Sequence, residues 1–561
     1  MDNQEILPLS LRLENRIGSR RGILLSIILF LILFLPWLIS SQELFRQEGL
    51  YAAAATDLIE HSWTPAMGAT TQAHGVPLRN IWPLYPLTVS LLYRCGIPME
   101  SALRIISALM LGVLSLLSGI SAGCRCSKRA GIVAACCGFA TLFALEKGVY
   151  GGPEAMSACF LLAAQLLFFH YGSRLADWNS AWISSSLFLA LGFLTSGPIV
   201  LIFFIFPLFF LRRPLSFAGK FRTPGFLAGV ILLLVVILTW ALPLGLSLRS
   251  YASSTEWEMI FTGKYWLEIL LFPLEFPLRM LPWSLLMWMP FCVALQSISQ
   301  TPVFSRYLRT LFFSMFALAW LIPGGSSKLI FFLIGPLSIL TGLTYELGIR
   351  RYGVFLRKAL ITSGMFFPAT VLVILGITFL PESIVTMLGE PEKMLFRNEI
   401  PGYLWLALLA IMVLTGLAVL YSYGIRRMPV WTELFLICCG IAVGAAVEFL
   451  PYRMMEKDWR KLGSDVRNAL PENTAKIYKY DIDGMYCGLF YVGTPVYQLH
   501  SLNELDEKED VIYVISSGLP LDPNRVWTPL LPDNYTCRGV PLSLWKGVRR
   551  ENDDAWMIPD E

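Results

Sequence analysis

Long hydrophobic stretches separated by short polar segments fill the first 450 residues of the chain. A helix needs about 20 apolar residues to cross about 30 Å of hydrocarbon. The first stretch, residues 22–40, is uncharged and lacks a small-x-small cleavage site, so we interpret it as a retained anchor. The pattern predicts thirteen transmembrane helices, with the other twelve at residues 102–122, 130–146, 154–171, 181–195, 198–211, 224–245, 280–297, 309–323, 329–346, 359–380, 402–422 and 430–450.

Two longer segments, residues 41–101 and 246–279, separate some of these stretches. In the first segment, apolar and polar positions alternate at helical spacing over residues 47–60, which predicts an amphipathic helix along the membrane surface. A second surface helix is predicted after Trp82, where the apolar stretch is too short to span. The second segment is rich in Trp, Tyr and Phe, which is typical of the membrane interface.

The pattern changes at residue 451, where short apolar runs begin to alternate with helical patterns. The alternation favours a small, mostly parallel sheet. We therefore divide the chain into a helical membrane domain, residues 1–450, and an external soluble α/β domain, residues 451–561. The predicted strands are residues 476–480, 495–499 and 511–515, and the predicted helices lie near 458–469, 484–491 and 501–507.

Composition supports this division. Hydrophobic residues make up 55% of the 561 positions and charged residues only 15%, whereas a soluble protein carries about 25% charge. Of the 84 charged residues, 31 lie in residues 451–561. The net charge of +4 is small and the basic residues form no single patch, so we predict no nucleic-acid partner.

The distribution of basic residues predicts the orientation, because short cytoplasmic loops collect Lys and Arg. With the N-terminus inside, twenty Lys and Arg residues fall in short inner segments, and about half as many fall in the longer outer ones. The sequence thus predicts an integral membrane protein with its N-terminus in the cytoplasm and its C-terminal domain outside. We expect the membrane to be a bacterial inner membrane, with that domain in the periplasm.

Two glutamates stand at the predicted outer ends of spans. Glu48 follows the first span, and Glu154 opens the fourth. The helix dipole stabilises a glutamate at a helix N-terminus, and two carboxylates facing one cavity could deprotonate an acceptor hydroxyl and hold a substrate. In the structural alternative, Glu154 caps a helix and Glu48 is a solvated interfacial charge. Position alone leaves both interpretations open.

Cations in the outer segments are candidate ligands for the phosphate of a lipid. Lys328 lies at an outer boundary, and Arg79, Arg249 and Lys264 occupy the outer loops. Guanidinium and ammonium groups bind phosphate through charge-assisted hydrogen bonds. The alternative is that each side chain is an anchor that reaches to the membrane interface.

Histidines and cysteines offer two further candidates. His61 and His74 lie near Glu60, but their spacing matches no standard metal motif, so a divalent metal stays an open alternative. Most of the eleven cysteines lie in or beside spans, where Cys is a small apolar residue. Cys487 and Cys537 are the pair in the external domain, and an oxidising compartment would join them in a disulfide.

Short motifs stand in order along the chain, and together they resemble those of a known family. They are Gln47-Glu48-Gly49-Leu50-Tyr51-Ala52, Glu154, Thr195-Ser196-Gly197-Pro198, Ser327-Lys328-Leu329 and, in the tail, residues 490–496 and 501–505. The set resembles polytopic glycosyltransferases of the GT-C type that use polyprenyl-phosphate sugars. These include the aminoarabinose transferases that modify lipid A and the protein O-mannosyltransferases.

The resemblance covers nearly the whole chain and implies its activity. An integral-membrane glycosyltransferase would move a sugar from a polyprenyl-phosphate donor to a lipid, glycan or protein acceptor at the outer membrane face. The reaction would be inverting, with Glu48 or Glu154 as the general base. Lys328, Lys264 and Arg79 would bind the donor phosphate. The cavity residues would be Tyr51, Gln47 and Tyr85.

Three positions depart from the family pattern. Gln47 stands where the family has its first acidic residue, Asn80 lies where it has a Glu-Lys-Pro-Pro segment, and Ser196 replaces a turn lysine. They motivate one rival hypothesis, a catalytically silent homologue that acts as a partner protein. A lipid or solute transporter is the other rival. It would place ionisable residues midway along spans, whereas here they cluster at span ends.

Overall fold

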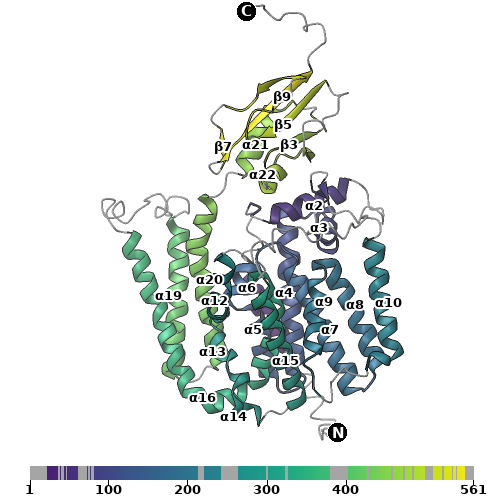
Figure 1. Ribbon diagram of the computed structural model, residues 1–561. Coiled ribbons are helices and arrows are strands. Elements are labelled where there is room, and N and C mark those ends of the chain that lie inside the picture. The colour runs from purple at the N-terminus through teal and green to yellow at the C-terminus, as the bar shows by residue number, and fades with distance from the viewer. Residues whose placement is uncertain are drawn as a thin grey trace, which may run out of the picture. The chain divides into compact units, whose positions relative to one another are not determined.

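Helices dominate the structure, a computed structural model, and its contacts divide the chain into two units (Figure 1). The first unit comprises residues 1–40 and 104–452, and the second comprises residues 41–103 and 453–561. The predicted boundary at residue 451 thus stays a prediction. The structure describes residues 22–35, 38, 43–45, 47–60, 72–73, 76–77, 81–212, 220–241, 263–298, 301–322, 326–378, 402–425, 429–455, 459–471, 474, 476–482, 485–499, 510–520, 524–532, 535–537 and 540–549.

Most hydrophobic stretches of the first unit form helices where the sequence predicts them. Three of these, Met99–Gly123, Glu154–Arg174 and Lys328–Phe366, are long and apolar enough to cross a membrane, and several others are apolar but shorter. The predicted total of thirteen spans stays a prediction. The helices are Gly22–Leu35, α4 (Met99–Gly123), α7 (Glu154–Phe169), α8 (Trp178–Ser196), α9 (Ile199–Leu208), α10 (Pro224–Ala241), α15 (Pro302–Leu321), α19 (Gly402–Ile425) and α20 (Val430–Met455).

The predicted span at residues 280–297 is wrong. These residues form short helical segments, because Pro282 and Pro290 lack the backbone N–H that a continuous helix needs. The preceding residues, which we assigned to an external segment, instead form an apolar helix. Residues 265–279 and 284–291 together could make one span, bent by 108°. The elements are α12 (Gly263–Arg279), α13 (Ser284–Met287), η6 (Met289–Phe291) and α14 (Val293–Gln296).

Two other predicted boundaries also differ. The span at residues 130–146 is broken, because the Thr141 hydroxyl accepts a hydrogen bond from the backbone N–H of Ala144 at 3.1 Å and so starts a new helix. Conversely, the spans at residues 329–346 and 359–380 lie on one helix. The elements are α5 (Lys128–Phe139), α6 (Leu142–Lys147) and α16 (Ser326–Thr378).

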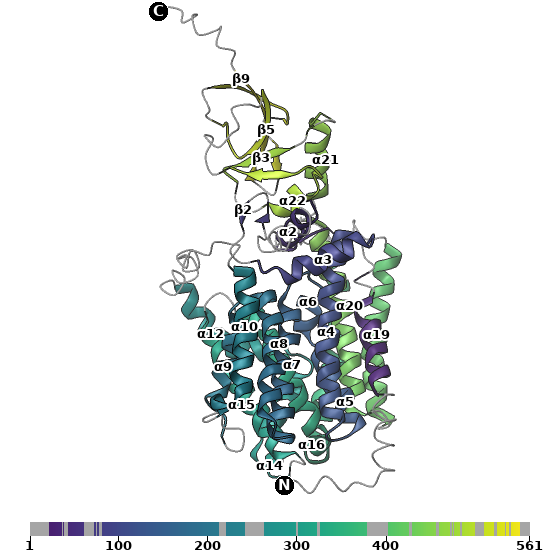
Figure 2. The same ribbon diagram turned by 90° about the vertical axis from the view of Figure 1, so that its right-hand side faces the viewer.

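A mixed five-stranded sheet with short helices forms the C-terminal part of the second unit (Figure 2). The three predicted strands are confirmed as β3 (Ile477–Tyr480), β4 (Val496–Gln498) and β5 (Val511–Ser516), and β3 pairs in parallel with both others. The expectation of a mostly parallel sheet is wrong, because β9 (Ser543–Arg549) pairs antiparallel with β5 and with β6 (Arg525–Pro529).

The helices of the second unit come from both ends of the chain. Helices are present at both predicted positions, as α2 (Glu48–Glu60) and α3 (Leu84–Arg94), and their place along the membrane surface stays a prediction. The predicted helices near 458–469 and 484–491 are confirmed as α21 (Trp459–Ala469) and α22 (Tyr486–Phe490), whereas residues 501–507 lie outside the described part. Short strand pairs complete the unit, β1 (Gln72–Ala73) with β2 (Val76–Pro77) and β7 (Thr536–Cys537) with β8 (Val540–Pro541).

Helices α2 and α22 make the closest contact between the two sequence segments of this unit. A Cβ atom added at Gly49 would lie 2.7 Å from both Cα and Sγ of Cys487, so only glycine fits there. Cys487 is 3% exposed, which shows that the contact excludes solvent. Helix α21 packs on α22 in the same way, with Gly463 against Tyr491. Two glycines therefore set the spacing of three helices.

We expect Gly49→Ala to destabilise the contact between α2 and α22, although Ala favours a helix over Gly by about 1 kcal/mol. The added methyl group has no space beside Cys487, and overpacking costs about 1–3 kcal/mol. Thiol labelling of Cys487 in the full-length protein, measured by peptide mass spectrometry, should therefore become several-fold faster.

Gly518→Ala is the matched control, because nothing lies within 4 Å of a Cβ atom added there. It should leave the labelling of Cys487 unchanged. If Gly49→Ala also left that rate unchanged, the close approach of α2 and α22 would be refuted.

Candidate functional site

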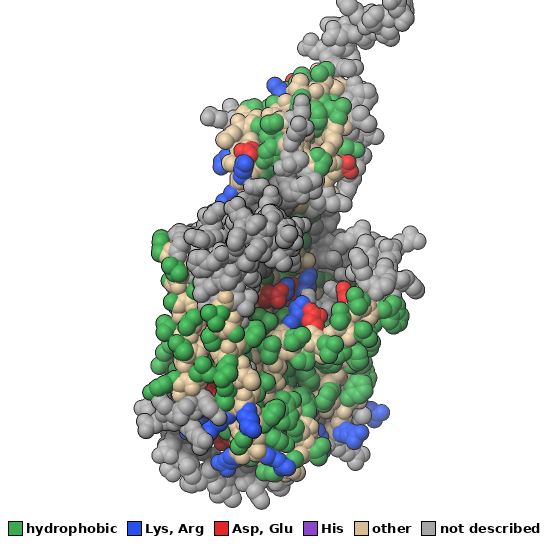
Figure 3. Space-filling view, turned by 90° about the vertical axis from the view of Figure 1, so that its left-hand side faces the viewer, with side chains coloured by type: hydrophobic (Ala, Val, Ile, Leu, Met, Phe, Trp, Pro, Cys, Tyr) green, Lys and Arg blue, Asp and Glu red, His purple; other side chains and the backbone are tan. Residues whose placement is uncertain are grey.

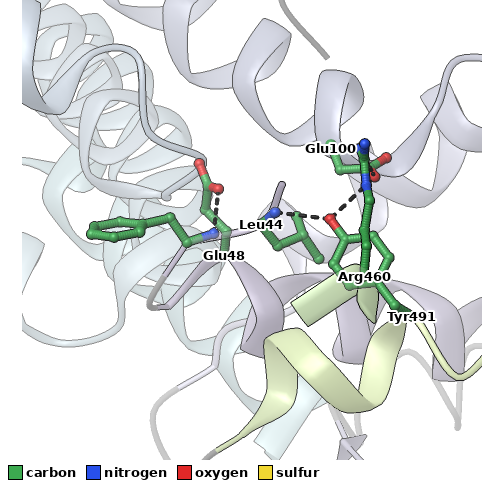
Figure 4. Close-up of polar contacts among 6 residues, drawn as sticks. Leu44, Glu48, Glu100, Arg460 and Tyr491 are labelled. Carbon is green, nitrogen blue, oxygen red and sulfur yellow. Dashed lines mark hydrogen bonds and ion pairs between the residues drawn. The ribbon is translucent and has the colours of Figure 1, made fainter. Parts of the chain in front are cut away.

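The first candidate carboxylate, Glu48, is the first residue of α2 and is 1% exposed. Its Oε2 accepts a hydrogen bond from the backbone N–H of Phe45 at 2.9 Å (Figure 4). A negative charge at this position also interacts favourably with the helix dipole. The neighbouring Gln47 is exposed. The buried acidic position at the start of α2 is therefore Glu48, and the prediction of a solvated interfacial charge is wrong.

A polar network from both sequence segments holds the chain just before Glu48. The backbone N–H of Leu44 donates to the Tyr491 hydroxyl at 2.9 Å, and that hydroxyl donates to Glu100 Oε1 at 3.2 Å (Figure 4). Arg460 Nη2 donates to the same Glu100 oxygen at 3.3 Å. Tyr491 thus joins the segment that precedes α2 to the first turn of α4.

The protonation of Tyr491 suits this role. Burial raises the pKa of its hydroxyl, and the nearby Glu100 raises it further. The hydroxyl therefore keeps its proton at neutral pH and can donate to Glu100 while it accepts from Leu44. Burial alone would lower the pKa of Arg460, but Tyr491 and Glu100 raise it overall, so the guanidinium stays charged.

The two predicted cavity tyrosines lie in the packing of α2 against α3. Tyr51 is 8% exposed, Tyr85 is fully buried, and their rings meet edge to face with centroids 5.3 Å apart. The Tyr85 hydroxyl donates to the backbone oxygen of Leu103 at 3.0 Å. This contact is structural, because it joins α3 to α4. The proposed cavity role of both tyrosines stays a prediction.

The second candidate carboxylate, Glu154, begins α7 in the first unit and is half-buried. It follows a turn that Ser107 of α4 fixes in place, because the Ser107 hydroxyl donates to the backbone oxygen of Gly152 at 2.8 Å and accepts from its N–H at 2.9 Å. The Glu154 carboxylate folds back towards Gly152. Pro153 is the N-cap of α7, and no side chain of the described residues makes a capping hydrogen bond there, so the prediction that Glu154 caps the helix is wrong.

Charged side chains lie on α6, α12 and α16, helices that contact one another in the first unit. Two contacts bring these helices together: the backbone N–H of Leu142 donates to the oxygen of Leu281 at 2.8 Å, and the rings of Phe143 and Phe331 lie 4.8 Å apart. Figure 3 shows acidic and basic side chains near one another on the helical body, among hydrophobic ones. We call Glu146, Lys147, Glu275, Arg279 and Lys328 the charged cluster.

Within the charged cluster, two cations are paired and one is exposed. Lys147 Nζ lies 3.2 Å from Glu146 Oε1, and Arg279 pairs with Glu275 one helical turn away. The other terminal nitrogen of Arg279, Nη1, is buried and has no hydrogen-bond partner among the described residues. Lys328 is exposed in the first turn of α16. The cluster can therefore offer positive charge and an unused N–H donor to an anion.

Sequence reasoning did not single out Lys147, Arg279 or Arg104 as site residues. Arg104 on α4 is 2% exposed. It lies inside the predicted span 102–122, and this position could have identified it, because ionisable residues within spans are usually functional. Arg279 could not be found in this way, because its segment was assigned to an external loop. Only the fold reveals that α12 is an apolar helix.

Several predicted site residues lie partly or wholly outside the described part of the chain. Arg79 is outside it, and Lys264 lies on α12 with no description of its side chain. Within the described residues, no three His, Cys, Asp or Glu side chains could hold a metal ion, and His61 and His74 are not among them. The Cys537 side chain is also not described, so the disulfide stays a prediction.

A comparison with solved structures identifies the fold. ArnT from Cupriavidus metallidurans bound to undecaprenyl phosphate matches 94% of this chain and 97% of its own, with a TM-score of 0.65 and 15% identity. Its apo structure matches equally well, with the same coverage, a TM-score of 0.65 and 14% identity. This chain therefore has the fold of ArnT, and the resemblance inferred from the sequence is confirmed at the level of the fold.

Another solved structure is less similar to this chain. The archaeal oligosaccharyltransferase AglB from Archaeoglobus fulgidus, in complex with an inhibitory peptide and a dolichol-phosphate, matches 90% of this chain and 69% of its own. The TM-score is 0.46 and the identity 10%. No protein-family model and no curated protein matches the sequence.

We expect Tyr491→Phe to loosen the segment before α2, because the N–H of Leu44 loses its acceptor. One hydrogen bond contributes about 1 kcal/mol, so amide hydrogen exchange at residues 43–50 should become roughly fivefold faster. Tyr497→Phe is the control, because the Tyr497 ring packs on Tyr478 in the sheet. Unchanged exchange at residues 43–50 in Tyr491→Phe would show that the network does not hold this segment.

Proposed function

We propose that this chain is an integral-membrane glycosyltransferase that transfers a sugar from a polyprenyl-phosphate donor to an acceptor hydroxyl. The observation that carries the proposal is the match along 94% of the chain to a structure with bound undecaprenyl phosphate. A match of this length covers most of both units. Following the basic residues of the loops, we place the site at the outer membrane face, with the N-terminus inside.

Glu48 is the preferred general base. The reaction breaks the bond between the anomeric carbon and the phosphate oxygen of the donor, and forms a bond from that carbon to the acceptor oxygen. The proton of the acceptor hydroxyl passes to the carboxylate, and the electron pair of the broken bond leaves with the polyprenyl phosphate. Glu48 suits the role because the backbone N–H of Phe45 holds its carboxylate at the start of α2, while Glu154 is the alternative.

The departing phosphate requires positive charge, and the charged cluster supplies it. Lys328 is exposed, and Arg279 has a buried N–H donor without a partner in the described part of the chain. Arginine and lysine stabilise a phosphate that gains charge in the transition state. We assign Arg279, Lys147 and Lys328 to the donor phosphate, with Lys264 and Arg79 as further candidates. Lipid, glycan and protein acceptors all carry a suitable hydroxyl.

Removal of the base tests the proposal. With radiolabelled polyprenyl-phosphate sugars and membrane extract, purified wild-type protein should transfer sugar, and Glu48→Gln should reduce the rate by about 10²–10⁴-fold, the usual contribution of a general base. The amide keeps the shape of the side chain but cannot accept the proton. If Glu154→Gln caused this loss and Glu48→Gln did not, the base would be Glu154.

Glu346→Gln is the control, because the Glu346 carboxylate accepts from Ser127 at 2.7 Å, away from the charged cluster, and should transfer normally. Full activity in both Glu48→Gln and Glu154→Gln would refute the assignment of the base. No transfer by wild-type protein with any donor, under conditions where ArnT is active, would favour the silent homologue.

We expect Arg279→Gln to raise the KM for the lipid donor by about tenfold or more, because a hydrogen bond to a charged group contributes about 1.5–3 kcal/mol. Glu275→Gln is the matched control, because it breaks the same ion pair but keeps the cation. It should leave the KM unchanged or lower it. Equal KM values for wild type and Arg279→Gln would remove Arg279 from the donor site.

A further inference from the structure

A cavity of about 560 Å³ lies in the first unit between the end of α9 and the first half of α15. These helices pack side by side (Figures 1 and 2). The proposed reaction does not use this cavity, because it is lined by none of the candidate carboxylates and by no member of the charged cluster. Its volume is sufficient for a small polar group and part of a hydrocarbon chain.

The walls of the cavity are apolar and partly open. Phe206, Phe210 and Phe313 line it, and the last two side chains are 54% and 56% exposed. Tyr307 forms the buried end of the cavity. Its side chain is 2% exposed, and its hydroxyl donates to the backbone oxygen of Gln165 at 2.9 Å. Large exposed rings on apolar helices are expected to contact lipid chains in a membrane protein.

Three arginines from both helices also line this cavity. They are Arg212 after α9 and Arg306 and Arg309 on α15, and no acidic residue is among the lining residues. Arg309 Nε donates to the backbone oxygen of Ser305 at 3.2 Å, which orients its guanidinium along the helix. No ion pair of these three arginines is present within the described ranges. Figure 3 shows that Lys and Arg side chains gather at the lower end of the helical body.

We propose that this cavity binds an anionic phospholipid of the inner leaflet, with its phosphate on the arginines and the start of one acyl chain against the phenylalanines. Basic pockets between transmembrane helices on the cytoplasmic side bind anionic lipid headgroups in this way. The general enrichment of Lys and Arg in cytoplasmic loops would by itself distribute arginines over several loops. Here three guanidinium groups from two helices line one cavity that also has apolar walls, which is complementary to a charged amphiphile.

The test compares retained lipid in the full-length protein. Protein reconstituted in nanodiscs of phosphatidylcholine with phosphatidylglycerol, then released into detergent, is analysed by native mass spectrometry for bound phosphatidylglycerol. The Arg306→Gln/Arg309→Gln double variant should retain about tenfold less than wild type, and Arg212→Gln should retain several-fold less. Arg350→Gln/Arg351→Gln is the matched control, because it removes equal charge from α16, outside the cavity.

A competition experiment distinguishes a phospholipid headgroup from free phosphate as the ligand. Inorganic phosphate at millimolar concentration should not displace the lipid, because it lacks the acyl chain that contacts the phenylalanines. Displacement would show a site for free phosphate instead and would overturn the proposal. Equal retention in wild type and the Arg306→Gln/Arg309→Gln variant would overturn it too, as would an equal loss in the Arg350→Gln/Arg351→Gln control.

Discussion

The hydroxyl of Tyr491 is the contact on which the arrangement around Glu48 depends. It accepts from the backbone of Leu44 and donates to Glu100, and so joins the C-terminal part of the second unit, the segment before α2 and the first turn of α4. Gly49 adds a steric constraint, because it allows α2 to lie directly against Cys487. Burial of Glu48 follows from this packing. The C-terminal part of the second unit thus helps to position the candidate base.

In the first unit, a few charged side chains lie among apolar helices. The members of the charged cluster lie on α6, α12 and α16, which contact one another, and ion pairs within the cluster reduce the cost of desolvation. Arg279 keeps a buried N–H donor with no partner in the described part. Such an unpaired donor is unfavourable unless a ligand uses it, which fits a phosphate-binding role.

Hydrophobic periodicity predicted much of the fold, because long apolar stretches and short alternating strands leave clear patterns. The positions of α4, α7 and β5 follow directly from it. It failed for α12, where the many Trp, Tyr and Phe residues suggested an interfacial loop, and at Pro282 and Pro290, which break the following segment. Whether these segments form one helix or several depends on tertiary contacts, which hydrophobic periodicity does not encode.

The site was only partly predictable for a related reason. The motif around α2 identified Glu48, and the position of Glu154 before an apolar stretch predicted a helix start. The antiparallel strands β6 and β9 were missed, because Pro529 and Gly547 interrupt their β-pattern. Tyr491 lies in a tail motif that gave no indication of its hydrogen bonds, and Arg279 lies in a segment assigned to an external loop. Their roles come from partners far away in the sequence or from a helix that the sequence did not predict.

The central claim is that the chain binds a polyprenyl phosphate through the charged cluster. The most direct measurement is an experimental structure of the full-length protein in nanodiscs that contain undecaprenyl phosphate. The account predicts the phosphate within hydrogen-bond distance of at least two of Lys147, Arg279 and Lys328. A phosphate bound elsewhere would contradict the account.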